Sequence, residues 1–274
     1  MYADLHIHTT HSDSSFDPER VVREAVLNGV GLIAITDHEL FSGSLEAEPL
    51  ARRAGLGFIR ALETECRFGG RFHHLLAYGV DFFEPRFHAM VGKNRETLDD
   101  MSVELIRRME PEYPGISLED FEAFERDALF GGWKGLEYFY KRGVTQAIRD
   151  GIPLYAQYGV TYEDAGFPEI DETIAAIHSA GGRAVLAHPW ATVPHPDEDV
   201  FMENVAALVD RGLDGVECFY PLHAPEVTKR LVDFCRGRDL IVTAGSDCHG
   251  NFGRARVGQM DIPIEALTLK GLDK

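Results

Sequence analysis

The sequence contains no long hydrophobic run. None of its apolar stretches approaches the roughly 18 consecutive apolar residues of a membrane-spanning helix. The N-terminus also lacks a basic segment followed by an apolar one, so we predict neither a membrane span nor a signal peptide. The four cysteines form no CxxC pair, and in a chain without an export signal they are most simply reduced thiols. These absences predict a cytoplasmic protein.

Basic residues are scarce. The 274 residues include 27 lysines and arginines against 45 aspartates and glutamates, which gives a formal net charge of −18. A general nucleic-acid binder needs a basic surface, so we expect no general nucleic-acid binding. The same charge disfavours an enzyme for anionic phosphates, unless bound metal ions make one pocket locally positive.

Strand-like and helix-like segments alternate along most of the chain. Hydrophobic residues make up 45% of the sequence, enough for a sizeable core, and α/β barrels of this length commonly form one domain. Short β-branched and apolar runs predict seven strands, at 2–8, 31–36, 57–63, 73–79, 183–188, 215–220 and 240–246. Amphipathic segments predict helices between them, at 18–29, 45–54, 171–181, 200–212 and 224–237. This alternation is typical of βα units around a parallel sheet.

Residues 89–170 interrupt the alternation. They contain no convincing strand, and their helical patterns lie near 95–109, 117–128 and 134–149. We interpret them as a helical insertion that forms a lid or substrate subdomain. Residues 1–88 and 171–274 are then the barrel-like domain.

The stretch DLHIHTTHSD, residues 4–13, places three histidines and two aspartates in ten positions. On a strand His6 and His8 point to the same side, because side chains alternate. A single HxH pair is a weak signal by itself. Further metal-type side chains, however, fall at or beside the ends of the other predicted strands: His38, Glu63, His74, His188, Glu217, Asp247 and His249. Since active sites assemble at the carboxyl ends of the strands in a parallel barrel, these residues predict one metal site.

The order of these motifs resembles a known family. HxH, TDH, a glutamate after a short strand, HHLLAYG, LAHP and GSDxHG are similar to the motifs of the PHP (polymerase and histidinol phosphatase) family of metal-dependent phosphoesterases. The resemblance covers residues 1–88 and 172–260. It implies an α/β fold, a distorted (β/α)7 TIM-like barrel, here with a helical insertion. It also implies two to three divalent metal ions, which in this family are manganese, iron or zinc.

The resemblance further implies three groups of metal ligands, with Glu63 shared between two of them. The groups are His6, His8, Glu63 and Asp247 for a first ion; Glu63, His74 and His188 for a second; and Asp13, His38 and His249 for a third. His11 competes with Asp13 for the third group. Because trinuclear members often carry histidine at this point of the motif, occupancy of the third site stays open.

A mixed set of imidazoles and carboxylates suits zinc, manganese or iron better than magnesium or calcium. We therefore predict a hydrolase acting on phosphate esters, in which a metal-bridging hydroxide attacks phosphorus and the catalytic residues are Glu63, His38, His249 and Asp247. The expected substrate is a small phosphorylated metabolite: a sugar phosphate, a nucleotide or a cyclic phosphodiester. Two alternatives stay open, an amidohydrolase-type enzyme that cleaves C–N or C–O bonds and a non-catalytic module stabilised by metal. The oligomeric state is not predicted.

Substrate contacts are less evident than metal ligands. Small PHP proteins commonly carry a GRxH segment in the insertion, and GGWKG, residues 131–135, occupies that place here without the arginine. Basic side chains suit phosphate oxygens, and we predict three contacts, from Lys134, His195 and Arg183, with Arg142 and Arg149 as further candidates.

Two acidic residues beside the predicted ligands are expected to support the site without binding metal. Asp37 precedes His38 and is expected to orient a histidine. Glu217, near the end of the sixth predicted strand, is expected to brace the site.

Overall fold

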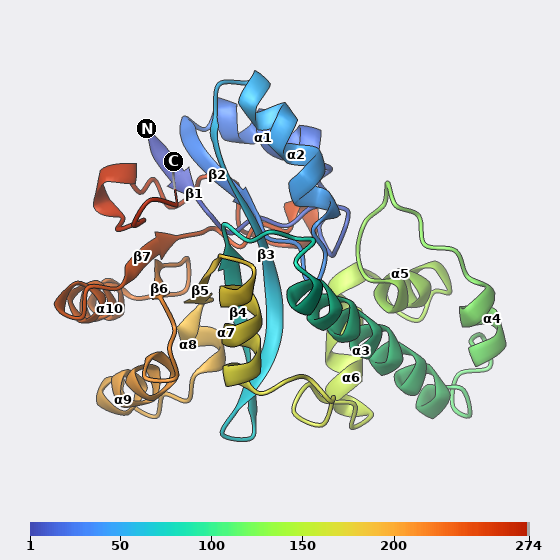
Figure 1. Ribbon diagram of the computed structural model, residues 1–274. Coiled ribbons are helices and arrows are strands. Elements are labelled where there is room, and N and C mark those ends of the chain that lie inside the picture. The colour runs from blue at the N-terminus through green and yellow to red at the C-terminus, as the bar shows by residue number, and fades with distance from the viewer. Residues whose placement is uncertain (273–274) are drawn as a thin grey trace.

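A computed structural model describes residues 1–272. Its seven strands form one mixed sheet in which each strand lies beside the next strand of the chain (Figure 1). The strands are β1 (Tyr2–Asp4), β2 (Val30–Ile35), β3 (Gly57–Phe68), β4 (Arg71–Tyr78), β5 (Arg183–Leu186), β6 (Gly215–Phe219) and β7 (Ile241–Ala244). The seven predicted strands are therefore present, as part of an α/β fold.

The predicted all-parallel sheet is wrong at one strand, because β4 runs antiparallel to both β3 and β5. Only Gly69 and Gly70 join β3 to β4, and both have positive φ, at 60° and 76°. A two-residue link with positive φ at both positions is a hairpin turn, which joins only antiparallel neighbours. The other neighbouring pairs are parallel.

The two outer strands of this order are brought together by the segments that follow them. The Leu5 N–H donates to the Ala244 carbonyl at 2.9 Å, the Asp247 N–H to the His6 carbonyl at 2.9 Å, and the His8 N–H to the Cys248 carbonyl at 3.1 Å. Residues 5–8 and 244–248 thus run side by side beyond the ends of β1 and β7.

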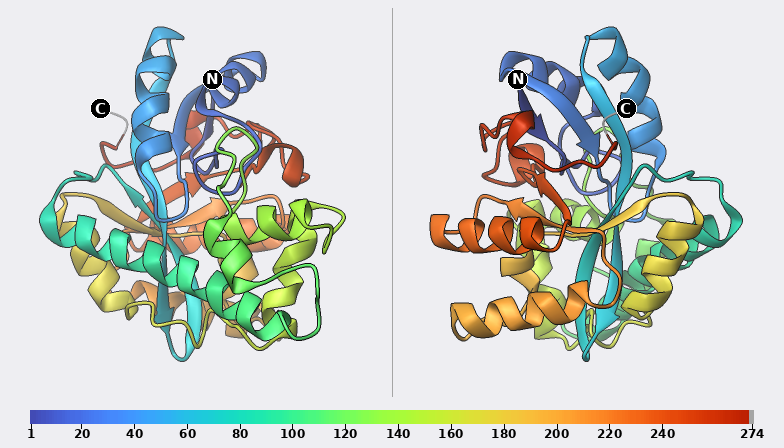
Figure 2. Two further views of the ribbon diagram at one scale, coloured as in Figure 1. Left: turned by 90° about the vertical axis from the view of Figure 1, so that its right-hand side faces the viewer. Right: turned by 60° about the vertical axis from the view of Figure 1, so that its left-hand side comes forward.

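Helices cover the outer face of the sheet, and α3 to α6 lie together on one side of it (Figures 1 and 2). The α-helices are α1 (Pro18–Leu27), α2 (Ser42–Arg53), α3 (Pro85–Met109), α4 (Leu118–Ala123), α5 (Lys134–Lys141), α6 (Ile152–Gln157), α7 (Ile170–Ser179), α8 (Pro189–Thr192), α9 (Glu198–Val209) and α10 (Pro225–Gly237). Three 3₁₀ turns complete the described elements: Ile148–Gly151, Gly250–Phe252 and Ile264–Ala266.

The helical insertion has a hydrophobic core of its own. Side chains of α3, α4, α5 and α6 pack into one cluster, which includes Leu105, Phe121, Tyr138 and Tyr155. A separate cluster fills the inner face of the sheet, with side chains from β1 to β5 and β7. The insertion therefore packs as a unit beside the sheet.

Several element boundaries differ from the prediction. β3 continues five residues beyond its predicted end, so Glu63 lies within the strand and not at its end. α3 begins at Pro85 because the Glu84 carboxylate caps the Phe87 N–H and proline suits the first helical position. The predicted helix 134–149 ends at Lys141, shortly before Gly143, which has a φ of 71°.

Candidate metal centre

The nine predicted metal ligands meet at one edge of the sheet. They come from the segments after β1, β2, β5 and β7, from the loop before α1, from β3 and from β4: His6, His8, Asp13, His38, Glu63, His74, His188, Asp247 and His249. His74 lies in the first half of β4, whereas most of the other ligands follow the ends of their strands. Since β4 is antiparallel, its start reaches the edge at which the parallel strands end.

A first donor group surrounds the Nε2 atoms of His6 and His8, which are 3.2 Å apart. Glu63 Oε2 lies 3.2 Å from the His6 nitrogen and 3.3 Å from the His8 nitrogen. Asp247 Oδ1 lies 3.4 Å and 3.2 Å from the same two nitrogens. Donors of a tetrahedral site with bonds of about 2.05 Å are about 3.3 Å apart, so these four atoms have the spacing of ligands around one ion.

A second donor group uses the other oxygen of Glu63. Its Oε1 lies 3.0 Å from His74 Nδ1 and 2.9 Å from His188 Nε2. The two imidazole nitrogens are 3.3 Å apart. Glu63 therefore presents one oxygen to each group, which is the geometry of a bridging carboxylate.

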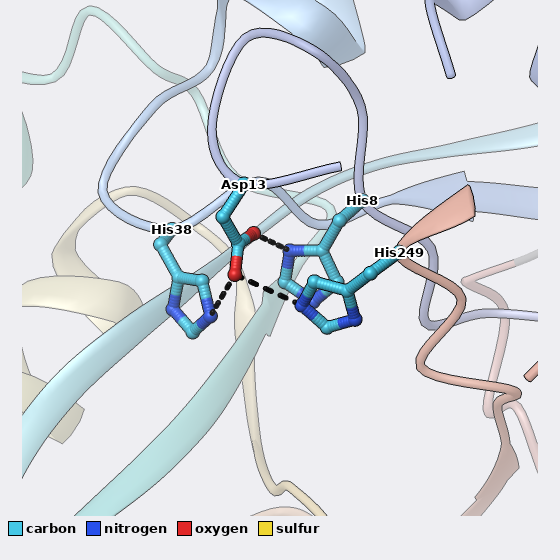
Figure 3. A group of neighbouring side chains, drawn as sticks. All are labelled: His8, Asp13, His38 and His249. Atoms are coloured by element: carbon cyan, nitrogen blue, oxygen red, sulfur yellow. Dashed lines mark ion pairs between the residues drawn. The ribbon is translucent and has the colours of Figure 1, made fainter. Parts of the chain in front are cut away.

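A third donor group converges on the carboxylate of Asp13 (Figure 3). Asp13 Oδ2 lies 3.0 Å from His249 Nε2 and 4.0 Å from His38 Nε2, and Asp13 Oδ1 lies 3.4 Å from His8 Nδ1. His11, the competing candidate, belongs to none of these groups.

Carboxylates and carbonyls behind the ligands fix the orientation of the rings. His6 Nδ1 lies 3.0 Å from Glu217 Oε1, and the other Glu217 oxygen accepts the backbone N–H of His188 at 2.7 Å, which fixes the main chain there. His249 Nδ1 donates to the Asp247 carbonyl at 2.9 Å, which directs Nε2 toward Asp13. Such partners fix the tautomer of a metal-binding histidine.

Asp37 does not orient a histidine, contrary to the expectation. Its carboxylate accepts the Thr9 N–H and the Thr9 and Ser12 hydroxyls at 2.6–2.7 Å. It thus holds the loop that carries Asp13. The side chain beside His38 is Glu65, whose Oε1 lies 3.0 Å from His38 Nδ1.

The backbone is strained at two of the nine predicted metal ligands. His188 and Asp247 have positive φ, at 26° and 54°, a region that side chains other than glycine rarely adopt. Strain of this kind persists only where the surroundings impose it, and it clusters at functional sites.

Opposite charges in the buried cluster shift the pKa values strongly. Burial lowers the pKa of His8, but Asp13, Asp247 and Glu63 outweigh it and raise the value to about 9. Burial raises the pKa of Glu63, but the surrounding histidines outweigh it and hold the value well below the ordinary range. In the metal-free cluster His6, His8 and His38, whose pKa values are raised strongly, therefore hold protons that a bound cation would replace.

A cavity of about 220 Å³ opens over the second and third donor groups. Its outer wall is mainly aromatic and apolar and comes from β4 and the helical insertion: Phe72, Leu98, Met101, Trp133, Ile152, Tyr155 and Tyr162. The Trp133 ring meets the His38 ring edge to face, at 5.7 Å between centroids. Among the described residues, Arg149 is the one arginine or lysine that lines it.

The structure does not bring the three predicted substrate contacts to this cavity. Lys134 Nζ lies over the Phe121 ring and 3.4 Å from the Glu122 carbonyl. His195 stacks on Trp190 with its Nδ1 bonded to the Val193 carbonyl, and Arg183 begins β5, at the opposite edge of the sheet, beside Asp214. The cavity wall instead has Trp133, next to Lys134 in the GGWKG segment, and Arg149.

The chain is similar to known proteins in both sequence and structure. The family description "PHP domain" matches residues 4–153. A phosphoribosyl 1,2-cyclic phosphate 1,2-diphosphodiesterase of Eggerthella lenta is 29% identical, over 93% of this chain and 96% of the relative. A 5′-3′ exoribonuclease of Haemophilus influenzae is 28% identical, over 93% of each chain. A crystal structure from Bifidobacterium adolescentis, classed as a metal-dependent phosphoesterase, shares a TM-score of 0.77 and 26% identity, over 94% of this chain and 91% of that one.

Among the described residues, no helix combines the length and the hydrophobicity that crossing a membrane requires.

Proposed function

The chain belongs to the PHP domain family and is a hydrolase acting on phosphate esters, and from this premise we propose that it hydrolyses a small phosphorylated metabolite at the metal centre described above. The proposal depends mainly on the position of Glu63, whose two carboxylate oxygens face two different donor groups. Family membership favours phosphate esters over the amidohydrolase alternative.

The three donor groups would hold two to three divalent ions, and their mixture of imidazole and carboxylate donors suits manganese, iron or zinc. Ions bound there would supply Lewis acidity toward the phosphate and acidify bound water. Glu63 and Asp247 supply the carboxylate oxygens of the first group, while His38 and His249 present Nε2 toward Asp13 at the cavity floor.

The cavity wall suggests how the rest of the substrate binds. Trp133, Tyr155 and Tyr162 would exclude water and pack against an apolar or aromatic part of the substrate, such as a nucleobase. Arg149 would hold a phosphate oxygen, and Arg254 lines the adjoining hollow beside Asp247 and His249. The non-phosphate part of the substrate would thus meet the insertion.

We also propose that the sheet closes as a barrel and that the helical insertion acts as its lid. Hydrogen bonds between residues 5–8 and 244–248 support a sheet that closes as a distorted barrel. The separate core of α3 to α6 supports residues 89–170 as a lid or substrate subdomain inserted into it.

The test combines metal analysis of the purified chain with phosphate-ester hydrolysis, with and without added Mn²⁺. The panel holds sugar phosphates, nucleotides, cyclic phosphodiesters and a short 5′-phosphorylated RNA, since one relative is named an exoribonuclease. We expect two to three metal ions per chain and hydrolysis of one compound class. Bound metal without hydrolysis of any phosphate ester would contradict the proposal and favour a non-catalytic module.

A further inference from the structure

Arg126 lies in the lid loop, which we define as residues 124–133 between α4 and α5. Its guanidinium donates to main-chain carbonyls on both sides. Nε donates to Gly132 at 2.6 Å, within the lid loop itself. Nη1 donates to His11 at 3.2 Å, and Nη2 donates to Ser12 at 2.9 Å and to Thr10. One side chain thus binds four carbonyls from two distant segments.

The second of these segments is the metal loop, which we define as residues 9–14. It carries Asp13, the centre of the third donor group, directly after the three carbonyls that Arg126 holds. Asp37 fixes the same loop from the opposite side through Thr9 and Ser12. The position of Asp13 therefore depends on a loop clamped between one arginine and one aspartate.

The two loops also touch through their backbones. A Cβ atom at Gly131 would lie 1.9 Å from the Ser14 carbonyl oxygen, so no residue larger than glycine fits there without displacement. Gly131 also has a φ of 78°. Two residues later, Trp133 forms part of the cavity wall and contacts the His38 ring.

The chemistry of arginine suits this place. A planar guanidinium has five donors in a fixed fork and can bind several carbonyls at once, whereas a lysine ammonium cannot span both loops. No ion pair of Arg126 occurs among the described residues, although the chain has an excess of acidic residues. The arginine serves the backbone of two loops and not a carboxylate.

We propose that Arg126 is a positioning residue that couples the lid loop to the metal loop, so that the third donor group and the Trp133 wall of the cavity form together. The proposal rests on the proposed function. Binding of a cation at Asp13 and closure of the cavity wall over His38 then favour each other, because both require the lid loop and the metal loop to be held together by Arg126.

The test titrates metal-free full-length protein with Mn²⁺ and follows stoichiometry by calorimetry and the emission of Trp133. All samples carry the substitution W190F, so that Trp133 is the only tryptophan that emits. In the reference protein, which keeps Arg126, we expect binding of the weakest-bound Mn²⁺ equivalent to change the emission of Trp133. In Arg126→Ala we expect this equivalent to bind at least tenfold more weakly without that change, while the tighter equivalents keep their affinity and KM rises more than kcat falls.

Two further variants make the result specific. Arg126→Gln, which keeps a donor at the site, should be intermediate and guards against misfolding of the alanine variant. Arg108→Ala is the matched control, since Arg108 also donates to two carbonyls, of Tyr158 and Gly159, but touches neither loop. It should bind metal as the wild type does.

The proposal is overturned if Arg126→Ala keeps every metal equivalent and the Trp133 response. Equal weakening of all equivalents would overturn it too, because Arg126 would then stabilise the fold in general. The metal stoichiometry and the Trp133 emission do not depend on hydrolysis, so absence of phosphate-ester hydrolysis in the wild type would remove the comparison of KM and kcat and would count against the proposed function alone.

Discussion

The Glu63→Gln variant is expected to hydrolyse phosphate esters about a thousandfold more slowly than the wild type and to bind fewer metal ions per chain. Loss of a residue that only orients a ligand commonly costs 10–100-fold, and Glu63 contacts both donor groups directly, so a larger effect is expected. A glutamine would offer one oxygen where the centre uses two, and its amide nitrogen would face His74 and His188 or His6 and His8. Metal analysis and initial rates at saturating substrate measure the two effects.

A matched control separates the site from the substitution itself. Glu169→Gln makes the same chemical change at an exposed carboxylate that pairs with Arg67, and it should alter neither rate nor metal content. Glu63→Gln that kept a full complement of metal and a rate within tenfold of the wild type would contradict the bridging role.

The convergence of the nine residues was predictable, because most of them lie in short motifs at or just after the ends of strands. The HxH spacing and the motifs after the second, fifth and seventh strands carry six of the nine residues directly. The family resemblance is confirmed by the match over residues 4–153. Their roles as ligands remain proposals, which the Glu63 variant tests.

The antiparallel direction of β4 could have been predicted from the sequence. Gly69-Gly70 between two β-like runs is a strong hairpin signal, yet the βα alternation elsewhere favoured a parallel strand. Had the hairpin been recognised, it would have explained why His74, at the start of its predicted strand, meets residues at the ends of the parallel strands.

The particular partners that meet across distant segments could not be predicted. Glu217 was expected to brace the site, but its contact with His6, 211 positions away, was not predicted, and neither was the contact of Arg126 with Ser12, 114 positions away. Neither contact leaves a local pattern, because it depends on how the sheet closes and where the insertion packs. The choice between Lys134 and Trp133 fails for a similar reason: both lie where α5 begins, and only packing decides which side chain lines the cavity.

Removal of the metal ions is expected to make the thermal stability of the chain depend on pH. The pKa of His8 is raised from 6.5 to about 9 in the folded metal-free protein, since Asp13, Asp247 and Glu63 outweigh the effect of burial. A folded-state pKa above the unfolded value contributes stability that is fully present below pH 6.5 and is lost as pH rises toward 9. His8 alone corresponds to about 3 kcal/mol, or roughly 5–10 °C in Tm for a domain of this size. The pKa values of His6 and His38 are raised as well, so both histidines add to the same pH dependence.

Bound metal removes this dependence, because a cation takes the place of the protons and stabilises the folded chain. We therefore expect the Tm difference between the metal-loaded and the metal-free protein to widen from pH 6.5 toward pH 9, measured by calorimetry on the two forms in parallel. His178→Ala is the control, since His178 pairs with Asp214 at the surface, far from the cluster in the fold, and should leave the slope unchanged. A Tm difference that stays constant or narrows over this range would show that His6, His8 and His38 do not exchange protons for metal, and the metal centre itself would then be in question.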